Sequence, residues 1–163
     1  MSSAPPAAPP AVDPWSAAPA LRDQPEFAAL IAAAAKVRAA AWAPYSGFRV
    51  GAALQSVSNR VYLGINVENA SYSAAICAER TALVGAITAG ERRFSRLAIV
   101  VDAAELAAPC GICRQSLAEF ALTSDVADLP VALANVGGDV VLVGLRDLLP
   151  RAFTPRSFQV RPG

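Results

Sequence analysis

The chain has 163 residues, 55% hydrophobic and 17% charged, which suits one compact domain with a sizeable core. Its formal net charge is only +1 and its Lys and Arg residues are scattered, so it has no basic surface of the kind that binds DNA or RNA. This charge pattern instead favours a small, near-neutral substrate. Charged residues or prolines interrupt every apolar run before about 20 residues, the length that crosses a membrane, so we expect no membrane partner.

The N-terminal residues are rich in Ala and Pro. Residues 1–22 lack the charged and continuous apolar regions of a secretory signal, and we interpret them as a disordered tail before one domain at 23–163. We therefore expect a cytoplasmic protein whose three cysteines stay reduced and serve metal or redox chemistry. The chain contains no histidine, so acid-base chemistry falls to a carboxylate, Lys, Tyr or Cys.

Apolar spacing predicts a first helix over residues 25–42, which the Pro and Gly residues of 44–47 end. Two strands follow, over residues 50–57 and 61–67. A turn at 58–60 joins them, so we expect an antiparallel hairpin.

Helical spacing returns after the hairpin. A second helix is predicted over residues 75–89, with Gly90 as its C-terminal cap. The residues expected on its inner face are Ile76, Leu83, Val84 and Ile87.

The last part of the chain alternates strands and helices. A buried strand is predicted over residues 97–101 and a third helix over 109–122. Short strands at 131–134 and 140–143 pair antiparallel, because their connection is too short for a parallel crossover. The sequence therefore predicts an α/β domain whose mixed five-stranded sheet has helices on both faces.

The cysteines fall at predicted helix starts. Cys110 and Cys113 form a Cys-x-x-Cys pair, which fits a redox couple, half a structural zinc site or two buried thiols. Cys77 adds a third sulfur near the start of the second helix. Three thiolates leave a fourth position of zinc open, as in catalytic sites, although an Asp or Glu ligand would close it as in structural sites.

Two segments carry a resemblance to a known family. Cys77-Ala78-Glu79-Arg80, followed by Pro109-Cys110-Gly111-Ile112-Cys113-Arg114-Gln115, resembles the signature of the zinc deaminase family. Similar stretches at 44–51, 66–73 and 148–153 extend the likeness over nearly all of the chain beyond residue 25. The chain is most similar to homotetrameric cytidine deaminases with three cysteine ligands, because related deaminases carry histidine at the position of Cys77. Blasticidin deaminases share three cysteines and are the nearest alternative.

The resemblance implies a three-layer α-β-α cytidine deaminase-like fold and one Zn²⁺ per chain, held by Cys77, Cys110 and Cys113. It gives Glu79 the role of proton carrier and Arg80 that of compensating the thiolate charge. Whether Arg114 also contacts the thiolates is left open. The implied reaction is the hydrolysis of cytidine and 2'-deoxycytidine to uridine and 2'-deoxyuridine with release of ammonia, in pyrimidine salvage. The alternatives are a deaminase of a modified nucleoside such as blasticidin S, and a protein with a purely structural zinc.

The resemblance also implies the substrate contacts. Asn66 and Glu68 match the pair that holds the ribose hydroxyls, Phe48 matches the residue packed on the pyrimidine, and the Ala78 N–H meets the base carbonyl. In the implied homotetramer, residues of a neighbouring subunit complete each site. The residues that match these contributions are Tyr72 and Phe153.

Overall fold

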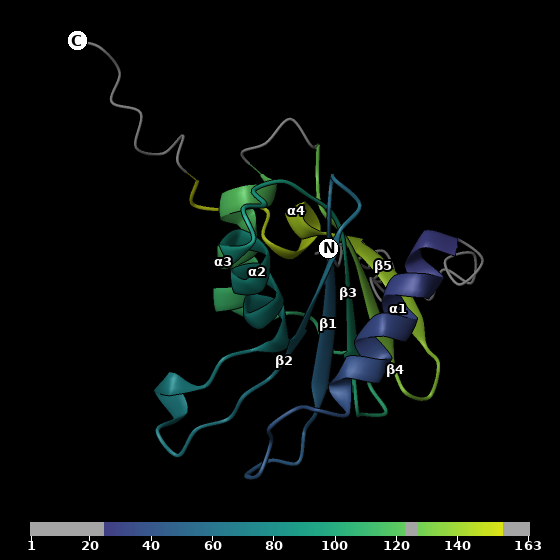
Figure 1. Cartoon of the computed structure of the whole chain (residues 1–163), viewed down its shortest axis with the longest axis vertical. Helices are drawn as coiled ribbons and strands as arrows, with labels where there is room; N and C mark the ends of the chain where they lie inside the picture. Colours follow the sequence, from purple (N-terminus) through teal and green to yellow (C-terminus); the bar gives the residue numbers. More distant parts are fainter. Residues whose placement is uncertain (1–24, 123–126, 155–163) are drawn as a thin grey trace, which may run out of the picture.

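The computed structural model describes residues 25–122 and 127–154 (Figure 1), so the predicted tail at 1–22 lies outside the described residues. In chain order the elements are α1 (Pro25–Arg38), β1 (Val50–Ser56), β2 (Val61–Ile65), the 3-10 helix η2 (Tyr72–Ala74), α2 (Ala78–Thr88), β3 (Phe94–Val101), α3 (Gly111–Ala121), β4 (Pro130–Asn135), β5 (Val140–Gly144) and α4 (Leu145–Leu148). None of the helices in these two stretches is long and apolar enough to cross a membrane.

The five strands form one sheet in the order β2-β1-β3-β4-β5. Only β3 and β4 run parallel, and every other neighbouring pair is antiparallel. Figure 1 shows α1 on one face of the sheet and α2, α3 and α4 on the other. The predicted three-layer fold with a mixed five-stranded sheet is therefore confirmed.

The central strand β3 shows how the sheet serves two cores. Its residues Leu97, Ile99 and Val101 belong to the core under α2 and α3, whereas Ala98 and Val100 belong to the core under α1. Successive side chains of a strand point to opposite faces, so a continuous apolar run buries both. The strand predicted at 97–101 extends back to Phe94.

The first helix is shorter than predicted. It ends at Arg38, and the next residues form tight turns up to Trp42. The backbone of Trp42 then pairs with the segment after β2: its N–H donates to the carbonyl of Asn66 at 3.0 Å, and its carbonyl accepts from the N–H of Glu68 at 2.8 Å. This pairing holds the loop after α1 against residues 66–68, two segments with predicted site residues.

The buried face of α2 differs from the predicted one. Ile76 precedes the helix and Val84 is 62% exposed, so the expectation that both face inward is wrong, whereas Leu83 is buried as predicted. The side chains that α2 buries are Ala78, Glu79, Ala82, Leu83 and Ala86. Small alanines replace the expected larger side chains because the helix lies very close to the sheet.

Gly64 of β2 makes this close approach possible. A Cβ atom at this position would lie 2.1 Å from the carbonyl oxygen of Ala78 and 2.4 Å from the nitrogen of Ala82. Such distances are far below van der Waals contact, so a side chain here would push the start of α2 away from the sheet. The Thr81 hydroxyl also donates to the carbonyl of Ile65 at 2.9 Å. The first turn of α2 is therefore fixed on β2.

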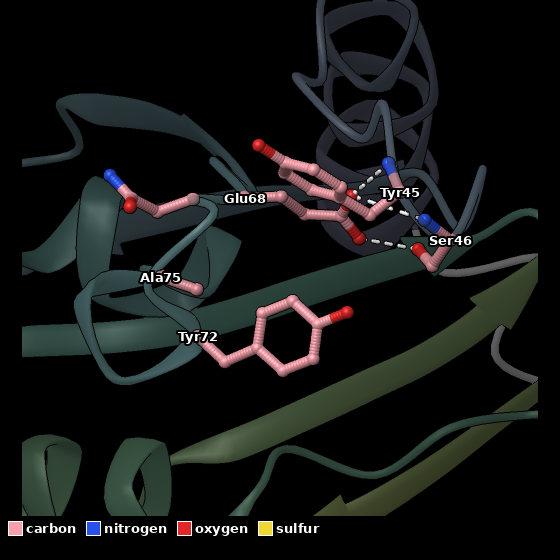
Figure 2. Close-up of a pocket in the computed structure, with 6 residues that line it drawn as sticks. Tyr45, Ser46, Glu68, Tyr72 and Ala75 are labelled. Atoms are coloured by element: carbon pink, nitrogen blue, oxygen red, sulfur yellow. Dashed lines mark hydrogen bonds between the residues drawn. The ribbon is translucent and has the colours of Figure 1, made fainter.

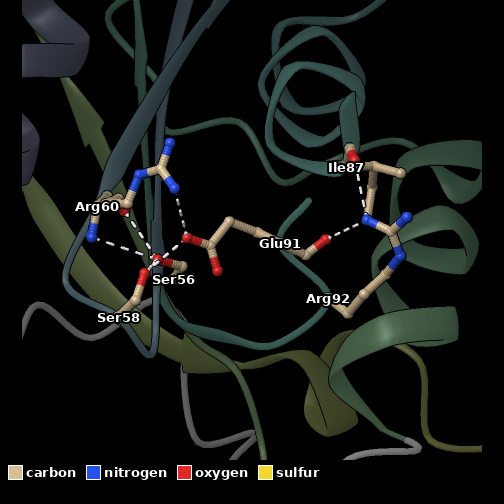
Figure 3. A network of polar contacts seen from close by, with 6 residues as sticks. All are labelled: Ser56, Ser58, Arg60, Ile87, Glu91 and Arg92. Carbon is tan, nitrogen blue, oxygen red and sulfur yellow. Dashed lines mark hydrogen bonds and ion pairs between the residues drawn. The ribbon is translucent and has the colours of Figure 1, made fainter. Parts of the chain in front are cut away.

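A polar network fixes the other end of α2 (Figure 3). The predicted turn at 58–60 is present, with Asn59 at φ 63°. Beside it, the hydroxyl of Ser58 contacts that of Ser56 at 2.8 Å and donates to the Glu91 carboxylate at 2.6 Å. Arg60 adds an ion pair with Glu91 at 3.5 Å. Because Glu91 follows α2 closely, the hairpin turn holds the chain where that helix ends.

Candidate active site

The three cysteines meet where two helices begin. Cys77 is the N-cap of α2, Cys110 is the N-cap of α3, and Cys113 lies in the first turn of α3. Their Sγ atoms all lie within 4.8 Å of one another. The Cys77–Cys110 separation is 3.8 Å and the Cys110–Cys113 separation is 3.5 Å. Tetrahedral zinc with Zn–S bonds of about 2.3 Å places its sulfurs about 3.8 Å apart, so the cluster fits zinc.

The surroundings of the cluster favour a thiolate at Cys77. The hydrogen bond from the Cys113 thiol is the largest cause that lowers the pKa of Cys77, and the contact with Cys110 and the charge of Arg80 act in the same direction against burial. Together they lower this pKa to about 5. The same hydrogen bond and burial raise the pKa of Cys113. The cluster thus holds a thiolate, the form of cysteine that binds metal.

Arg80 and Arg114 have different surroundings. Arg80 contacts Cys77 electrostatically, donates from Nη2 to the carbonyl of Ala75 at 3.0 Å, and has a buried Nε without a hydrogen-bond partner in the described parts of the chain. Arg114 instead donates to the carbonyls of Pro109 at 2.6 Å and Leu148 at 2.9 Å. Arg80 therefore stands where thiolate charge needs compensation, while Arg114 ties the loop before Cys110 to α4.

Glu79 is one of the few buried polar residues, with 5% of its surface exposed. Burial raises the pKa of its carboxyl group, and the nearby Cys77 thiolate acts in the same direction. A carboxyl group with a raised pKa exchanges protons more readily near neutral pH, as a general acid and base requires. Its place in the first turn of α2, two residues after Cys77, brings this group to the cysteine cluster.

A pocket of about 190 Å³ opens beside this cluster. We call it the cysteine pocket; its lining includes Phe48, Val50, Asn66, Cys77, Ala78, Glu79, Ile99, Val101, Ala107, Ala108 and Cys110. Phe48 is 38% exposed and lines this pocket from a loop, so it does not belong to either core. Ala78 is the first residue of α2, where a backbone N–H lacks an acceptor within the helix. A hydrogen-bond donor therefore lies at the pocket wall.

A second pocket, of about 290 Å³, surrounds Glu68 (Figure 2). We call it the Glu68 pocket; it is lined by Tyr45, Ser46, Glu68, Asn69, Tyr72 and Ala75. Oε2 of Glu68 accepts hydrogen bonds from the backbone N–H groups of Tyr45 at 2.8 Å and Ser46 at 3.2 Å, and Oε1 accepts one from the Ser46 hydroxyl. The Ser46 hydroxyl bond and the Tyr45 N–H bond lower the pKa of Glu68. This side chain is therefore held as a carboxylate.

Asn66 lines the cysteine pocket and holds the Phe48 loop. Its Oδ1 accepts from the N–H of Val50 and its Nδ2 donates to the carbonyl of Phe48, both at 2.8 Å. An amide group has two N–H donors and two oxygen lone pairs, so one of each is left for another partner. By the same count, a carboxylate has about four acceptor positions, and Glu68 has one left, on Oε1.

The two residues predicted to reach a neighbouring subunit are both at the surface. Tyr72 begins η2 and is 78% exposed, with its ring centroid 6.3 Å from that of Tyr45. Phe153 is 56% exposed, and its carbonyl accepts a hydrogen bond from the Gln115 side chain at 2.7 Å. Within the chain, Tyr72 lines the Glu68 pocket.

Sequence reasoning missed the contributions of Ser46 and Gln115. Both lie in the segments that resemble the deaminase family, but neither was given a role. Gln115 follows the Cys-x-x-Cys pair and holds the segment with Phe153. Ser46 lies in a turn before Gly47, whose φ is +70°, and a small hydroxyl residue in a turn is a weak signal of a side-chain hydrogen bond.

Three sulfurs at zinc spacing, with a buried carboxyl group in the adjoining pocket of an α-β-α fold, define the class of zinc-dependent deaminases. A family model for the cytidine and deoxycytidylate deaminase zinc-binding region matches residues 26–127. The chain belongs to the cytidine deaminase family.

Individual relatives agree with this family. The cytidine deaminase of Sporosarcina psychrophila is 46% identical over 125 residues, 77% of this chain and 89% of the relative. That of Halalkalibacterium halodurans is 45% identical over 125 residues, 77% of this chain and 92% of the relative. The crystal structure of cytidine deaminase from Burkholderia pseudomallei has a TM-score of 0.72 and 48% identity, covering 77% of this chain and 98% of that one. The predicted family and zinc cofactor are confirmed.

Proposed function

We propose that this protein is a zinc-dependent deaminase of cytidine and 2'-deoxycytidine, acting in pyrimidine salvage. The observation that carries the proposal is a cluster of three sulfurs at zinc spacing beside the cysteine pocket, which two of these cysteines and the buried Glu79 line. In the reaction, water adds its oxygen to C4 of the pyrimidine ring and the C4–N bond to the amine breaks. The products are uridine or 2'-deoxyuridine and ammonia.

The cysteine cluster and the two charged residues beside it have separate tasks. Cys77, Cys110 and Cys113 hold Zn²⁺, which when bound lowers the pKa of water and so supplies a nucleophile at neutral pH. Glu79 removes one proton from the attacking water and delivers it to N3 of the ring. It then takes the second proton of that water from the oxygen now on C4 and passes it to the leaving amine, which departs as ammonia. Arg80 compensates the negative charge that three thiolates leave at the centre.

The pyrimidine ring is held at the wall of the same pocket. The exposed edge of Phe48 packs on the ring, since an aromatic side chain at a pocket wall offers a flat apolar surface. The N–H of Ala78 donates to the carbonyl group of the base, because the helix leaves this donor without an acceptor.

The sugar is recognised by the hydrogen-bonding capacity that Asn66 and Glu68 have left. A hydroxyl group donates one hydrogen bond and accepts others. The remaining Oε1 position of Glu68 accepts from a sugar hydroxyl, and the remaining N–H of Asn66 donates to it. The carboxylate also repels a phosphate group, which favours nucleosides over nucleotides.

The proposed activity is tested by an assay of ammonia release with loss of the cytidine absorbance. Cytidine and 2'-deoxycytidine are expected to give one ammonia per nucleoside consumed, and cytidine 5'-monophosphate is expected to react far more slowly because of Glu68. Blasticidin S serves as the modified nucleoside. Zinc without any ammonia from these substrates would point to a structural metal site instead.

We also propose that the protein acts as a homotetramer in which Tyr72 and Phe153 complete a neighbouring subunit's site. The exposure of both aromatic side chains supports this arrangement, because large apolar groups at a surface commonly mark an interface. A dissociated chain would then have an open pocket and poor catalysis even with zinc bound.

Co-assembly of two defective chains tests the shared site. A Glu79→Gln chain lacks the proton carrier and a Phe153→Ala chain lacks the aromatic ring, but a hybrid assembly brings one intact copy of each together. Random mixing in equal amounts should restore about a quarter of the sites. Activity of the mixture above the sum of the separate chains supports the proposal. A fully active species that sediments as a monomer at assay concentration rules it out.

A further inference from the structure

Ser46 connects two parts of the site that lie far apart in sequence. Its hydroxyl donates to Oε1 of Glu68 and accepts from the backbone N–H of Phe48 at 3.0 Å. Its own N–H donates to Oε2 of Glu68 at 3.2 Å. Figure 2 shows the contact between Ser46 and Glu68. The same small side chain also bonds to the backbone of Phe48, so it joins the carboxylate of the Glu68 pocket to a residue that lines the cysteine pocket.

The hydroxyl decides which acceptor position of Glu68 stays free. The two backbone N–H groups occupy Oε2, and Ser46 occupies one position of Oε1, so the remaining acceptor has a fixed direction. Without the hydroxyl, Oε1 would have no protein partner among these contacts and the carboxylate could turn about its chain. The hydrogen bond from Ser46 also contributes most to lowering the pKa of Glu68.

The position of the Phe48 backbone depends less on Ser46 than the orientation of the Glu68 carboxylate does. The Phe48 carbonyl remains held by Nδ2 of Asn66, and the N–H of Val50 remains held by Oδ1 of the same side chain. Because Phe48 lies in an exposed loop, water can take the place of the Ser46 oxygen at its N–H. Removal of the Ser46 hydroxyl should therefore mainly change the orientation of the Glu68 carboxylate.

We propose that Ser46 is a positioning residue that orients the Glu68 carboxylate toward a hydroxyl group of the nucleoside sugar. The proposal rests on the proposed function, since it assigns Ser46 a part in sugar recognition by the deaminase. Ser46 acts through Glu68 and does not touch the reacting atoms, so its removal affects KM for substrates with sugar hydroxyls more than kcat.

The test compares two substrates in zinc-loaded enzyme. Ser46→Ala should raise KM for cytidine about tenfold, the effect of losing a hydrogen bond to a charged group, with kcat changed less than about threefold. In 2',3'-dideoxycytidine the sugar keeps only its 5'-hydroxyl, so the 2'- and 3'-hydroxyls that we assign to Glu68 are absent, and its kcat/KM should change less than about twofold. Ser46→Thr keeps a hydroxyl and should restore KM for cytidine.

A double-mutant cycle shows whether Ser46 acts through Glu68. In a Glu68→Ala background, Ser46→Ala should add no further penalty on cytidine, because the partner of the hydroxyl is already gone. Ser116→Ala is the matched control: it removes a hydroxyl that bonds to the Ile112 carbonyl of its own helix, and it should leave both substrates unaffected. If Ser46→Ala does not fold, Ser46→Gly removes the same hydroxyl in a form suited to a turn.

The experiment distinguishes a failure of the role proposed for Ser46 from a failure of the proposed function. An equal loss for cytidine and dideoxycytidine, or no loss for either, in a variant that keeps one zinc per chain overturns the role of Ser46 alone. A wild-type enzyme that deaminates neither substrate overturns the proposed function and the role of Ser46 with it.

Discussion

Replacing Glu79 with glutamine is expected to lower kcat for cytidine by at least about 100-fold, because general acid-base catalysis contributes roughly 10²–10⁴ and the proposed mechanism gives every proton transfer to Glu79. The amide keeps the size of the side chain but cannot accept and return a proton. No histidine is present to replace it. Turnover of the purified, zinc-loaded variant under saturating cytidine measures the effect.

Zinc content and stability separate this loss of chemistry from misfolding. The three sulfurs are unchanged in Glu79→Gln, so one zinc per chain should remain. Burial disfavours the charged form of Glu79, so a neutral amide should not lower the unfolding temperature. Glu26→Gln is the matched control, since within the described residues this carboxylate forms a long 3.9 Å pair with Arg96 on the α1 side of the sheet, away from the cysteine cluster. Turnover of Glu79→Gln within about tenfold of wild type would assign the protons to another group.

The order and type of the main elements were predictable because each has a strong local signal. The apolar run of β3 and the spacing of α1 and α3 indicate their structure directly. The face of α2 was not predictable in the same way. Apolar spacing favours Ile76 and Val84 as inner residues, but the bare backbone of Gly64 admits only a stripe of alanines. The buried face of α2 therefore depends on its contact with β2, and the apolar periodicity within α2 carries no information about that contact.

Short elements and long-range contacts were also beyond sequence reasoning. The helix α4 has four residues, too few for a periodic pattern, and Asp147 supports its start by accepting from the N–H of Gly144 at 3.1 Å. Ser46 and Glu68 are 22 residues apart in sequence. Their contact arises because the loop after α1 pairs with the segment after β2, and no residue pattern in either segment alone indicates it.

The cysteine cluster was predictable for the opposite reason. A helix N-terminus is a common place for an anionic ligand, and Cys77 and Cys110 each lie near the start of a predicted helix. The role of Arg80 was also predicted, whereas the distances between the sulfurs, the burial of Glu79 and the partners of Arg114 required the structure.

Replacing Cys110 with alanine is expected to abolish tight zinc binding and to lower activity at least about 100-fold, because even changes in the groups around metal ligands cost about 10- to 100-fold. Cys110 is exposed, so the loss of its side chain removes little packing and the effect reports on the metal. Metal analysis of the purified variant and its rate with cytidine measure both consequences.

Metal-free wild-type enzyme is the reference with which the Cys110→Ala variant is compared. A chelator should give an inactive enzyme with a lower unfolding temperature, since zinc binding stabilises the folded state, and added zinc should restore both properties. The Cys110→Ala variant should resemble the metal-free wild type and should not respond to zinc. Ile112→Ala is the matched control, because this exposed side chain lies between Cys110 and Cys113 without offering a ligand atom. A Cys110→Ala enzyme that keeps one zinc and most of its activity would show that two sulfurs suffice, and the three-thiolate centre would have to be abandoned.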